Sequence, residues 1–524
     1  MTSKHWTTAF GALAWHAGRR PDAPGLRFPL SDDARSYGEW HREALHLAQG
    51  LLALGLRPGD HIALLAEARI EWPIVETAIS AMGGVMVPLN THYRAEEIRY
   101  ALDQSRSRAL FVSPSFRSNP YLEMVESVRG DLPGLRLVIA FGSGGDLEYG
   151  QLLKRGEGAS ATLPAPGPRD PAALLYTSGT TGFPKGALLT HHGMLTNSRS
   201  IFERLRIGPD DRYTTMIPLF HCAGCCMVVL GILQSGACYV GVPSFDPETM
   251  FRIIETEDIT AMSAVPTAYL AMLRSEARAR CDLSTLRAGT CGGADADAQM
   301  LEACARDFPF PRLANVYGQT ETNTLIACPE YDDDDRWATV GRPLPGFEVR
   351  ITDPADRRIL PAGEIGEIEA RSDQNMLGYF DRPKETAETI GSDGWLKTGD
   401  LGMLTPEGRV VIAGGRIRDM IIRGGENVYP AEVEKVLNEC PAIVEAVVFG
   451  IADEYYGEIV AAAVRLDGPA TAADIAAYCG PRMARFKIPA KFFAVTSFPM
   501  TASGKIRRKQ LREMAAEGRL TPID

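Results

Sequence analysis

The stretch Thr177-Ser178-Gly179-Thr180-Thr181-Gly182-Phe183-Pro184-Lys185-Gly186 places three glycines, four hydroxyl side chains and one lysine within ten residues. It follows the apolar run Ala172–Tyr176, which predicts a buried strand. In such a loop, successive backbone N–H groups and hydroxyls can turn toward phosphate oxygens. The glycines allow the positive φ angles and the close backbone approach that this needs. The pattern therefore predicts a phosphate-binding loop directly after a strand.

The loop does not match the Walker A motif. That motif has Gly directly before its Lys and Ser or Thr directly after it. Here Lys185 stands between Pro184 and Gly186, which disfavours a P-loop kinase or GTPase. For the loop taken alone, a flexible Gly/Thr hairpin remains an alternative.

Helix and strand patterns alternate before the loop. Helices are expected at Tyr37–Leu54, Trp72–Met82 and Ala95–Ser105. Short apolar strands are expected at His61–Leu65, Val85–Pro88 and Ala109–Val112. This alternation predicts βαβ units, and hence a parallel sheet that helices cover on both faces.

The same alternation returns after residue 200. Strands are expected at Met216–Pro218, Ala237–Val242, Ala261–Val265, Leu286–Cys291 and Leu313–Tyr317. Residues 339–412 are richer in strand and turn patterns and predict a small β-barrel or distorted sheet. A compact α+β lobe is expected beyond Gly414. The fold class is therefore α/β, with two doubly wound sheets, a small β-barrel and a C-terminal α+β domain.

Length and composition bound the class of protein. The chain has 524 residues, of which 45% are hydrophobic and 23% charged, as in soluble proteins of several domains. Its net charge of −11 argues against a nucleic-acid partner. The N-terminus lacks a signal-peptide pattern, so the ten cysteines are expected to be reduced and the protein cytoplasmic. Dimers are common among enzymes, which makes a homodimer the default expectation.

Three features imitate other kinds of site. Residues 222–244 carry no charge, but Gln234-Ser235-Gly236 interrupts them, which favours a buried helix followed by a strand over a membrane span. Cys222, Cys225 and Cys226 lie near a single His221, and we interpret them as buried small side chains rather than metal ligands. The carboxylate run Asp332–Asp335 is interpreted as a solvated loop.

Five further clusters accompany the Gly/Thr loop. They are Gly292-Gly293-Ala294, Tyr317-Gly318-Gln319-Thr320-Glu321, the segment from Asp393 to Asp400, the region from Gly415 to Asn427, and Ser503-Gly504-Lys505. Each alone has an ordinary structural interpretation. Tyr317 could be a core residue, Asp400 a turn cap and Lys505 part of a basic tail. Their joint occurrence and their order change that balance.

In this order the clusters resemble the AMP-forming, adenylate-forming enzymes, which include acyl-CoA synthetases, adenylation domains of peptide synthetases and firefly luciferase. The resemblance extends from about Tyr37 to Arg512 and favours the acyl-CoA synthetase branch. It implies an adenylation core over residues 1–417 and a mobile lid domain over residues 418–524. It also implies ATP, Mg²⁺ and coenzyme A as cofactors.

The resemblance assigns roles in a first step, in which ATP activates a carboxylic acid to an acyl-adenylate and pyrophosphate leaves. It implies that Lys505 acts at the α-phosphate, that Thr320 touches a phosphate and that Glu321 is the Mg²⁺ ligand. The loop from Thr177 to Lys185 would hold the β- and γ-phosphates, Tyr317 would stack on adenine, and Asp400 with Arg416 would hold the ribose. The implied nucleotide and cofactor site also includes Thr177, Ser178, Gly179, Thr180, Thr181, Gly182, Lys185, Gly292, Gly293, Ala294, Gly318, Gln319, Gly424, Gly425 and Asn427.

In the second step of the family, the C-terminal domain rotates and CoA attacks. The resemblance places a hinge at Arg418 and brings the loop Gly424-Gly425-Glu426 to the acyl-adenylate. His221 resembles the aromatic position that gates the CoA tunnel, although a core histidine remains an alternative.

The leading hypothesis is a carboxylate:CoA ligase. The alternative is an adenylating enzyme with another acceptor, above all a carrier protein. No acid follows Phe220, where amino-acid-activating domains resemble one another in having one, and Asp295 is only a weak rival. A nucleotide sensor without catalysis is a third possibility, which an intact Lys505 and Glu321 disfavour. Small and apolar residues around the acyl site indicate an uncharged medium-chain, cyclic or aryl acid.

Overall fold

The computed structural model describes residues 6–524, except residues 178–183, 295, 297, 309–310, 335–336, 417–418, 424–425, 429, 454–455, 484 and 501–505. The chain divides into two compact units. One comprises Met1–Glu348 with Ala370–Leu396, and the other comprises Val349–Glu369 with Lys397–Asp524. The predicted boundary between residues 417 and 418 falls on residues outside this description and stays a prediction.

The first unit contains an eight-stranded sheet in the order β19-β9-β8-β4-β3-β5-β6-β7. Its strands are β3 (His61–Leu65), β4 (Val85–Pro88), β5 (Ala109–Val112), β6 (Leu137–Ala140), β7 (Leu147–Glu148), β8 (Pro171–Thr177), β9 (Lys185–Thr190) and β19 (Gly378–Tyr379). Strands β4, β3, β5, β6 and β7 are neighbours in this order and run parallel to one another. Strand β9 pairs antiparallel with both β8 and β19. All residues of β4 and β5 are buried, as expected for parallel strands covered on both faces.

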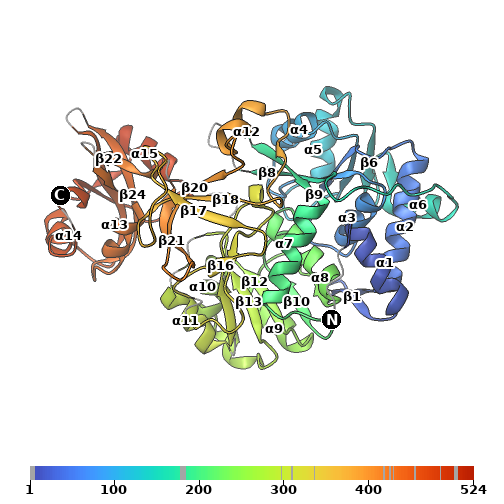
Figure 1. Ribbon diagram of the computed structural model, residues 1–524, viewed down its shortest axis with the longest axis horizontal. Helices are drawn as coiled ribbons and strands as arrows, with labels where there is room; N and C mark the ends of the chain where they lie inside the picture. Colours follow the sequence, from blue (N-terminus) through green and yellow to red (C-terminus); the bar gives the residue numbers. More distant parts are fainter. Residues whose placement is uncertain are drawn as a thin grey trace. The chain divides into compact units, whose positions relative to one another are not determined.

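Helices cover both faces of this sheet (Figure 1). On one side lie α1 (Ala9–Arg19), α2 (Tyr37–Ala53), α3 (Glu71–Ala81) and α6 (Tyr149–Glu157). On the other side α4 (Ala95–Gln104) and α5 (Tyr121–Val128) bury Ile98, Leu102 and Val125 against the strands. Helix α2 begins where its sequence predicts, because Ser36 and Glu39 form a capping box.

The second sheet of this unit has seven strands in the order β14-β13-β12-β10-β11-β1-β2. They are β1 (Pro24–Phe28), β2 (Asp33–Ser36), β10 (Arg212–Thr215), β11 (Cys238–Val240), β12 (Ala261–Ala264), β13 (Ala288–Cys291) and β14 (Arg312–Asn315). All pairs are parallel except β1–β2. Helices α9 (Pro247–Thr256), α10 (Pro266–Arg274) and α11 (Ala298–Asp307) bury their apolar side chains against it.

The strand prediction at Met216–Pro218 was wrong by one strand length. Strand β10 is Arg212–Thr215, and residues 216–218 follow it as a loop. Pro218 has no N–H to donate to a neighbouring strand, whereas Thr214 and Thr215 are buried β-branched residues. The uncharged segment after it contains a π-helix (Ala223–Val229), α8 (Leu230–Ser235) and β11, a helix followed by a buried strand as predicted.

The remaining elements of the first unit include one long helix and several short elements. Helix α7 (His191–Arg204) leaves β9, α12 (Pro383–Thr389) follows β19, and β15 (Ala327–Cys328) pairs with β16 (Arg342–Pro343).

The second unit contains two sheets. In the region predicted as a small barrel or a distorted sheet, the structure has a four-stranded sheet in the order β17-β18-β20-β21, from β17 (Glu348–Thr352), β18 (Gly366–Arg371), β20 (Leu396–Leu404) and β21 (Val410–Arg416). The predicted α+β lobe follows. Its strands are β22 (Ile421–Arg423), β23 (Glu426–Val428), β24 (Ile443–Asp453), β25 (Gly457–Leu466), β26 (Lys491–Ala494) and β27 (Thr521–Pro522), and its helices are α13 (Pro430–Asn438), α14 (Ala472–Cys479) and α15 (Arg508–Ala516).

The α/β fold class, with a large N-terminal region and a C-terminal domain, is confirmed. Within the described residues, no helix is both long enough and apolar enough to cross a membrane.

Candidate functional site

The Gly/Thr loop connects the two strands of a β-hairpin. Thr177 at the end of β8 pairs with Lys185 at the start of β9, and the Thr177 hydroxyl donates to the Lys185 carbonyl at 3.4 Å. From helix α4, the Tyr100 hydroxyl donates to the carbonyl of Pro184 at 3.0 Å. Residues Ser178, Gly179, Thr180, Thr181 and Gly182 lie outside the described residues. The sheet therefore fixes both ends of the loop, and α4 also holds the end at Pro184.

Gly292 and Gly293 lie at the carboxyl end of β13, as predicted. A Cβ on Gly292 would come within 2.7 Å of the Val316 side chain and 2.8 Å of its carbonyl oxygen. Gly293 has a φ of +82°, which L side chains rarely adopt. Gly293 and Ala294 are exposed, so the backbone at this end of the strand is open to a ligand.

Tyr317, Gly318, Gln319, Thr320 and Glu321 follow the neighbouring strand β14. Because β13 and β14 are parallel and pair Cys291 with Asn315, this segment emerges beside the two glycines. Ligands of open parallel sheets bind at this edge. Gly318 is required, since a Cβ there would lie 2.1 Å from the Thr324 carbonyl oxygen. Tyr317 is half-buried, whereas Glu321 is buried in a short 3₁₀ turn.

His221 and Cys222 reach the same edge from the loop that follows β10. The Thr320 hydroxyl lies 3.5 Å from the Cys222 sulfur, and the Thr324 hydroxyl donates to the Cys222 carbonyl at 3.3 Å. His221 is only partly buried and its ring packs on Phe220, with 4.3 Å between the ring centroids. Its partial exposure does not favour the core-histidine interpretation.

The π-helix Ala223–Val229 begins directly after these residues. Such wide turns are rare in proteins, and those that occur are often found at functional sites.

Burial raises the pKa of the Cys222 thiol to about 11. Cys225 and Cys226 are buried, and no group of three metal-binding side chains is found in the described part of the chain. Asp332, from the carboxylate run, forms ion pairs with Arg206 and Arg312.

Tyr379, which the sequence analysis did not single out, connects the two sheets at this site. The N–H of Met376 donates to the Glu321 carbonyl at 2.8 Å, and the Tyr379 hydroxyl donates to Glu321 Oε1 at 2.7 Å. The ammonium of Lys185 lies 4.3 Å from the centroid of the Tyr379 ring. The only local pattern was an aromatic residue after Gly378. Its importance depends on the pairing of β19 with β9, which is distant in sequence.

The chemistry of Glu321 fits a hard cation. Mg²⁺ prefers oxygen ligands. Oε1 accepts from Tyr379, and among the described residues no hydrogen-bond partner is found for Oε2. Thr320 adds a hydroxyl next to this carboxylate in the same turn. These oxygen groups would suit a cation that is shared with phosphate oxygens.

In the second unit, Asp400 and Arg416 lie opposite each other in register on β20 and β21. Asp400 is buried, and its N–H donates to the Thr398 hydroxyl at 3.1 Å. The N–H of Gly399, where φ is +71°, donates to Glu367 Oε1 at 3.1 Å. The predicted ribose pair thus shares one corner of a sheet, although only the backbone of Arg416 is described.

Other predicted residues are placed less fully. Asn427 lies in β23, where it pairs with Ile422, and only its backbone is described. Arg423, which lies within the predicted region from Gly415 to Asn427, donates to the Phe486 carbonyl at 2.7 Å and packs on the Tyr456 ring. The predictions for Gly424, Gly425, Arg418, Asp295 and Lys505 lie outside the described residues.

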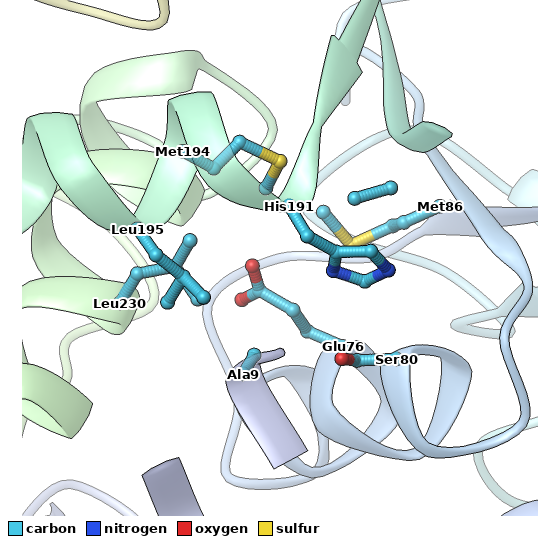
Figure 2. Close-up of a pocket in the computed structure, with 9 residues that line it drawn as sticks. Ala9, Glu76, Ser80, Met86, His191, Met194, Leu195 and Leu230 are labelled. Carbon is cyan, nitrogen blue, oxygen red and sulfur yellow. The ribbon is translucent and has the colours of Figure 1, made fainter. Parts of the chain in front are cut away.

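A small cavity of about 20 Å³ lies elsewhere in the first unit (Figure 2). Its lining includes Ala172, at the start of β8, and His191, just after the end of β9. The Gly/Thr loop connects the opposite ends of these strands. The cavity is therefore separate from the candidate site.

Comparison with known proteins shows which family the chain matches. Residues 13–380 match the family model of the AMP-binding enzymes, and residues 432–505 match that of the AMP-binding enzyme C-terminal domain.

Two curated relatives are CoA ligases. The chain is 35% identical over 505 residues to a methyl-dioxo-octahydroindenyl-propanoyl:CoA ligase of Mycobacterium tuberculosis, covering 94% of this chain and 96% of that one. It is 32% identical over 532 residues to the mitochondrial medium-chain acyl-CoA ligase ACSF2 of Danio rerio, covering 94% and 86%.

Among solved structures, ATP-bound MatB from Rhodopseudomonas palustris is similar over 97% of this chain and 98% of its own, with a TM-score of 0.87 and 30% identity. The family match covers more than half of the chain. The two relatives, which are ligases, match this chain over nearly their whole length. The chain therefore belongs to the AMP-binding enzyme family and is an acyl-CoA synthetase.

Proposed function

We propose that this enzyme uses ATP and Mg²⁺ to convert a carboxylic acid, whose medium-chain, cyclic or aryl tail carries no charge, to an acyl-adenylate, from which it then transfers the acyl group to CoA. One observation carries this proposal. The Thr320–Glu321 turn, the Gly292–Gly293 backbone and the His221–Cys222 segment converge at one edge of the seven-stranded sheet.

The first step needs no general base, because a carboxylic acid is ionised near pH 7. The difficulty is electrostatic, since an anion attacks the α-phosphate of a polyanion. We assign Lys505 to the α-phosphate, and Lys185 with the Thr177–Gly182 loop to the β- and γ-phosphates. Asp400 and Arg416 hold the ribose, and Tyr317 stacks on adenine. A bound Mg²⁺ would neutralise phosphate charge, and Glu321 with Thr320 would hold it.

The second step requires a different arrangement, because the CoA thiol must reach the acyl carbon from which AMP leaves. In this proposal the C-terminal domain rotates about Arg418, so that the Gly424–Gly425 loop replaces Lys505. His221 lines the path of the thiol. Each role is a prediction from the family pattern.

Two observations support the proposed type of carboxylic acid. Cys222, Ala223 and Gly224 follow His221 without a charge that could pair with a charged substrate tail. The two curated relatives act on a cyclic and on medium-chain acyl groups by their names. A carrier protein as acceptor has less support, since both of those relatives are CoA ligases.

The test is pyrophosphate release from ATP and Mg²⁺ over a panel of carboxylic acids, with and without CoA. We expect release that depends on a particular acid and rises strongly with CoA. Release that stops at about one equivalent per enzyme, whether or not CoA is present, would point instead to a carrier-protein acceptor. Nucleotide binding without release on any acid would favour a nucleotide sensor.

A further inference from the structure

The side chain of Tyr379 lies between the two groups of opposite charge at the candidate phosphate site. Its hydroxyl donates to Glu321 Oε1 at 2.7 Å, and its ring faces the Lys185 ammonium, which is 4.3 Å from the ring centroid. Tyr379 and Glu321 are both less than a tenth exposed. Tyr379 therefore contacts both charges in a place that is largely shielded from water.

The backbone around Tyr379 fixes this position. The segment Met376–Phe380 hydrogen-bonds to β9 through Leu377 N–H to the Leu188 carbonyl and Phe380 N–H to the Gly186 carbonyl, both at 2.8 Å. On its other side, Met376 N–H donates to the Glu321 carbonyl. The same short segment thus holds Glu321 by its backbone and its side chain, beside the end of the Gly/Thr loop.

A direct ion pair between Lys185 and Glu321 would weaken both groups. A Lys ammonium paired with a carboxylate is less available to a phosphate, and that carboxylate is less available to a cation. Among the described residues, Lys185 and Glu321 form no ion pair with each other. The Tyr379 ring satisfies the cation through its π face, and the hydroxyl satisfies one carboxylate oxygen.

We propose that Tyr379 is a positioning residue, which orients the Glu321 carboxylate for the phosphate-bound cation and keeps Lys185 apart from it. This inference rests on the proposed function. It gives the Met376–Phe380 segment a specific part in ATP binding. The hydroxyl and the ring of Tyr379 contribute to it separately.

The hydroxyl is tested by Tyr379→Phe, which keeps the ring and should preserve folding. The measurement is the Kd for ATP by calorimetry, once in EDTA and once in saturating Mg²⁺, without a carboxylic acid. The Kd in EDTA divided by the Kd in Mg²⁺ gives the gain in ATP affinity that Mg²⁺ provides. A hydrogen bond to a charged group predicts that Tyr379→Phe lowers this ratio by about tenfold. The Kd in EDTA should change little.

The double variant Tyr379→Phe with Glu321→Gln shows whether the effect passes through Glu321. We expect its ratio to equal that of Glu321→Gln alone, because the two substitutions interrupt the same contact. The ring is tested by Tyr379→Leu, which should also weaken ATP binding in EDTA, since Lys185 can then reach Glu321. Tyr37→Phe is the matched control. Its buried hydroxyl donates to the carbonyls of Ile232 and Ala237, outside the candidate site, and its ratio should match the parent enzyme.

The outcomes separate this inference from the proposed function. A parent enzyme that does not bind ATP more tightly with Mg²⁺ would overturn both. A normal parent ratio that Tyr379→Phe leaves unchanged would overturn the positioning role alone. Fully additive effects of Tyr379→Phe and Glu321→Gln on the ratio would also overturn the positioning role alone.

Discussion

Glu76 and His191 line the same small cavity from helices α3 and α7, and burial favours the neutral form of both (Figure 2). Neither carboxylate oxygen of Glu76, nor Nε2 of His191, has a hydrogen-bond partner among the described residues. Ser80 from α3 and apolar side chains, among them Met194 and Leu195, complete most of the lining. A charge in this place would be shielded from solvent and would lack a hydrogen-bond partner among the described residues, which makes the cavity a source of pH-dependent stability.

The first prediction concerns Glu76→Gln. Burial raises the pKa of Glu76 well above 4.5, with a smaller contribution from Cys225. The folded protein then holds a proton that the unfolded chain releases above about pH 4.5, so stability is lost as pH rises. Glutamine removes this loss. We expect the variant to have a higher Tm than the parent at pH 7 and no advantage at pH 4. An equal Tm difference at both pH values would contradict a protonated Glu76.

The second prediction concerns His191→Leu and has the opposite sign. Burial lowers the pKa of His191 from 6.5 to about 4, and Asp170 opposes this only in part. The unfolded chain therefore takes up a proton between pH 6.5 and 4 that the folded protein refuses, at a cost of about 3 kcal/mol by pH 4. The variant should lose less stability than the parent between these pH values in matched thermal scans. His16, whose pKa burial also lowers to about 4, should leave a residual acid sensitivity.

The sequence predicted those parts of the fold that depend on local patterns. Strands β3, β4 and β5 have the expected bounds, because each is a short apolar run between turn residues. The pairing of β1 with β11 could not be predicted, since it joins residues that are more than 200 positions apart and no local pattern encodes it. Tyr379 was missed for the same reason. Its contact with Glu321 arises only when β19 adds to β9.

The third prediction tests how the Gly/Thr loop is held. The Tyr100 hydroxyl donates to the Pro184 carbonyl at 3.0 Å. Tyr100→Phe should loosen this end of the loop and raise the KM for ATP about two- to tenfold, with little change in kcat. Tyr121→Phe is a suitable control, because its hydroxyl also donates to a carbonyl, that of Thr91 at 2.6 Å. A lower Tm with an unchanged KM for ATP would mean that Tyr100 only stabilises the fold.

The fourth prediction separates the two steps at Lys505. If Lys505 neutralises charge at the α-phosphate, Lys505→Ala should slow adenylate formation by about a hundredfold or more. It should leave thioester formation from supplied acyl-adenylate and CoA nearly intact, because the α-phosphate is then no longer attacked. The two half-reactions are measured separately by pyrophosphate release and by thioester yield. Equal losses in both would refute the assignment of Lys505 to the first step alone.

The final prediction tests the hinge at Arg418. A hinge must absorb a large change in φ and ψ, and proline fixes φ at about −65°. Arg418→Pro should therefore still form acyl-adenylate, which accumulates on the enzyme, while turnover to the thioester falls. Arg418→Ala is the matched control, since it removes the same side chain but keeps backbone freedom, and it should turn over CoA much faster than the proline variant. Equal thioester rates in the two variants would show that no backbone rotation at Arg418 is needed. Single-turnover assays with the same acid and CoA measure both steps in each variant.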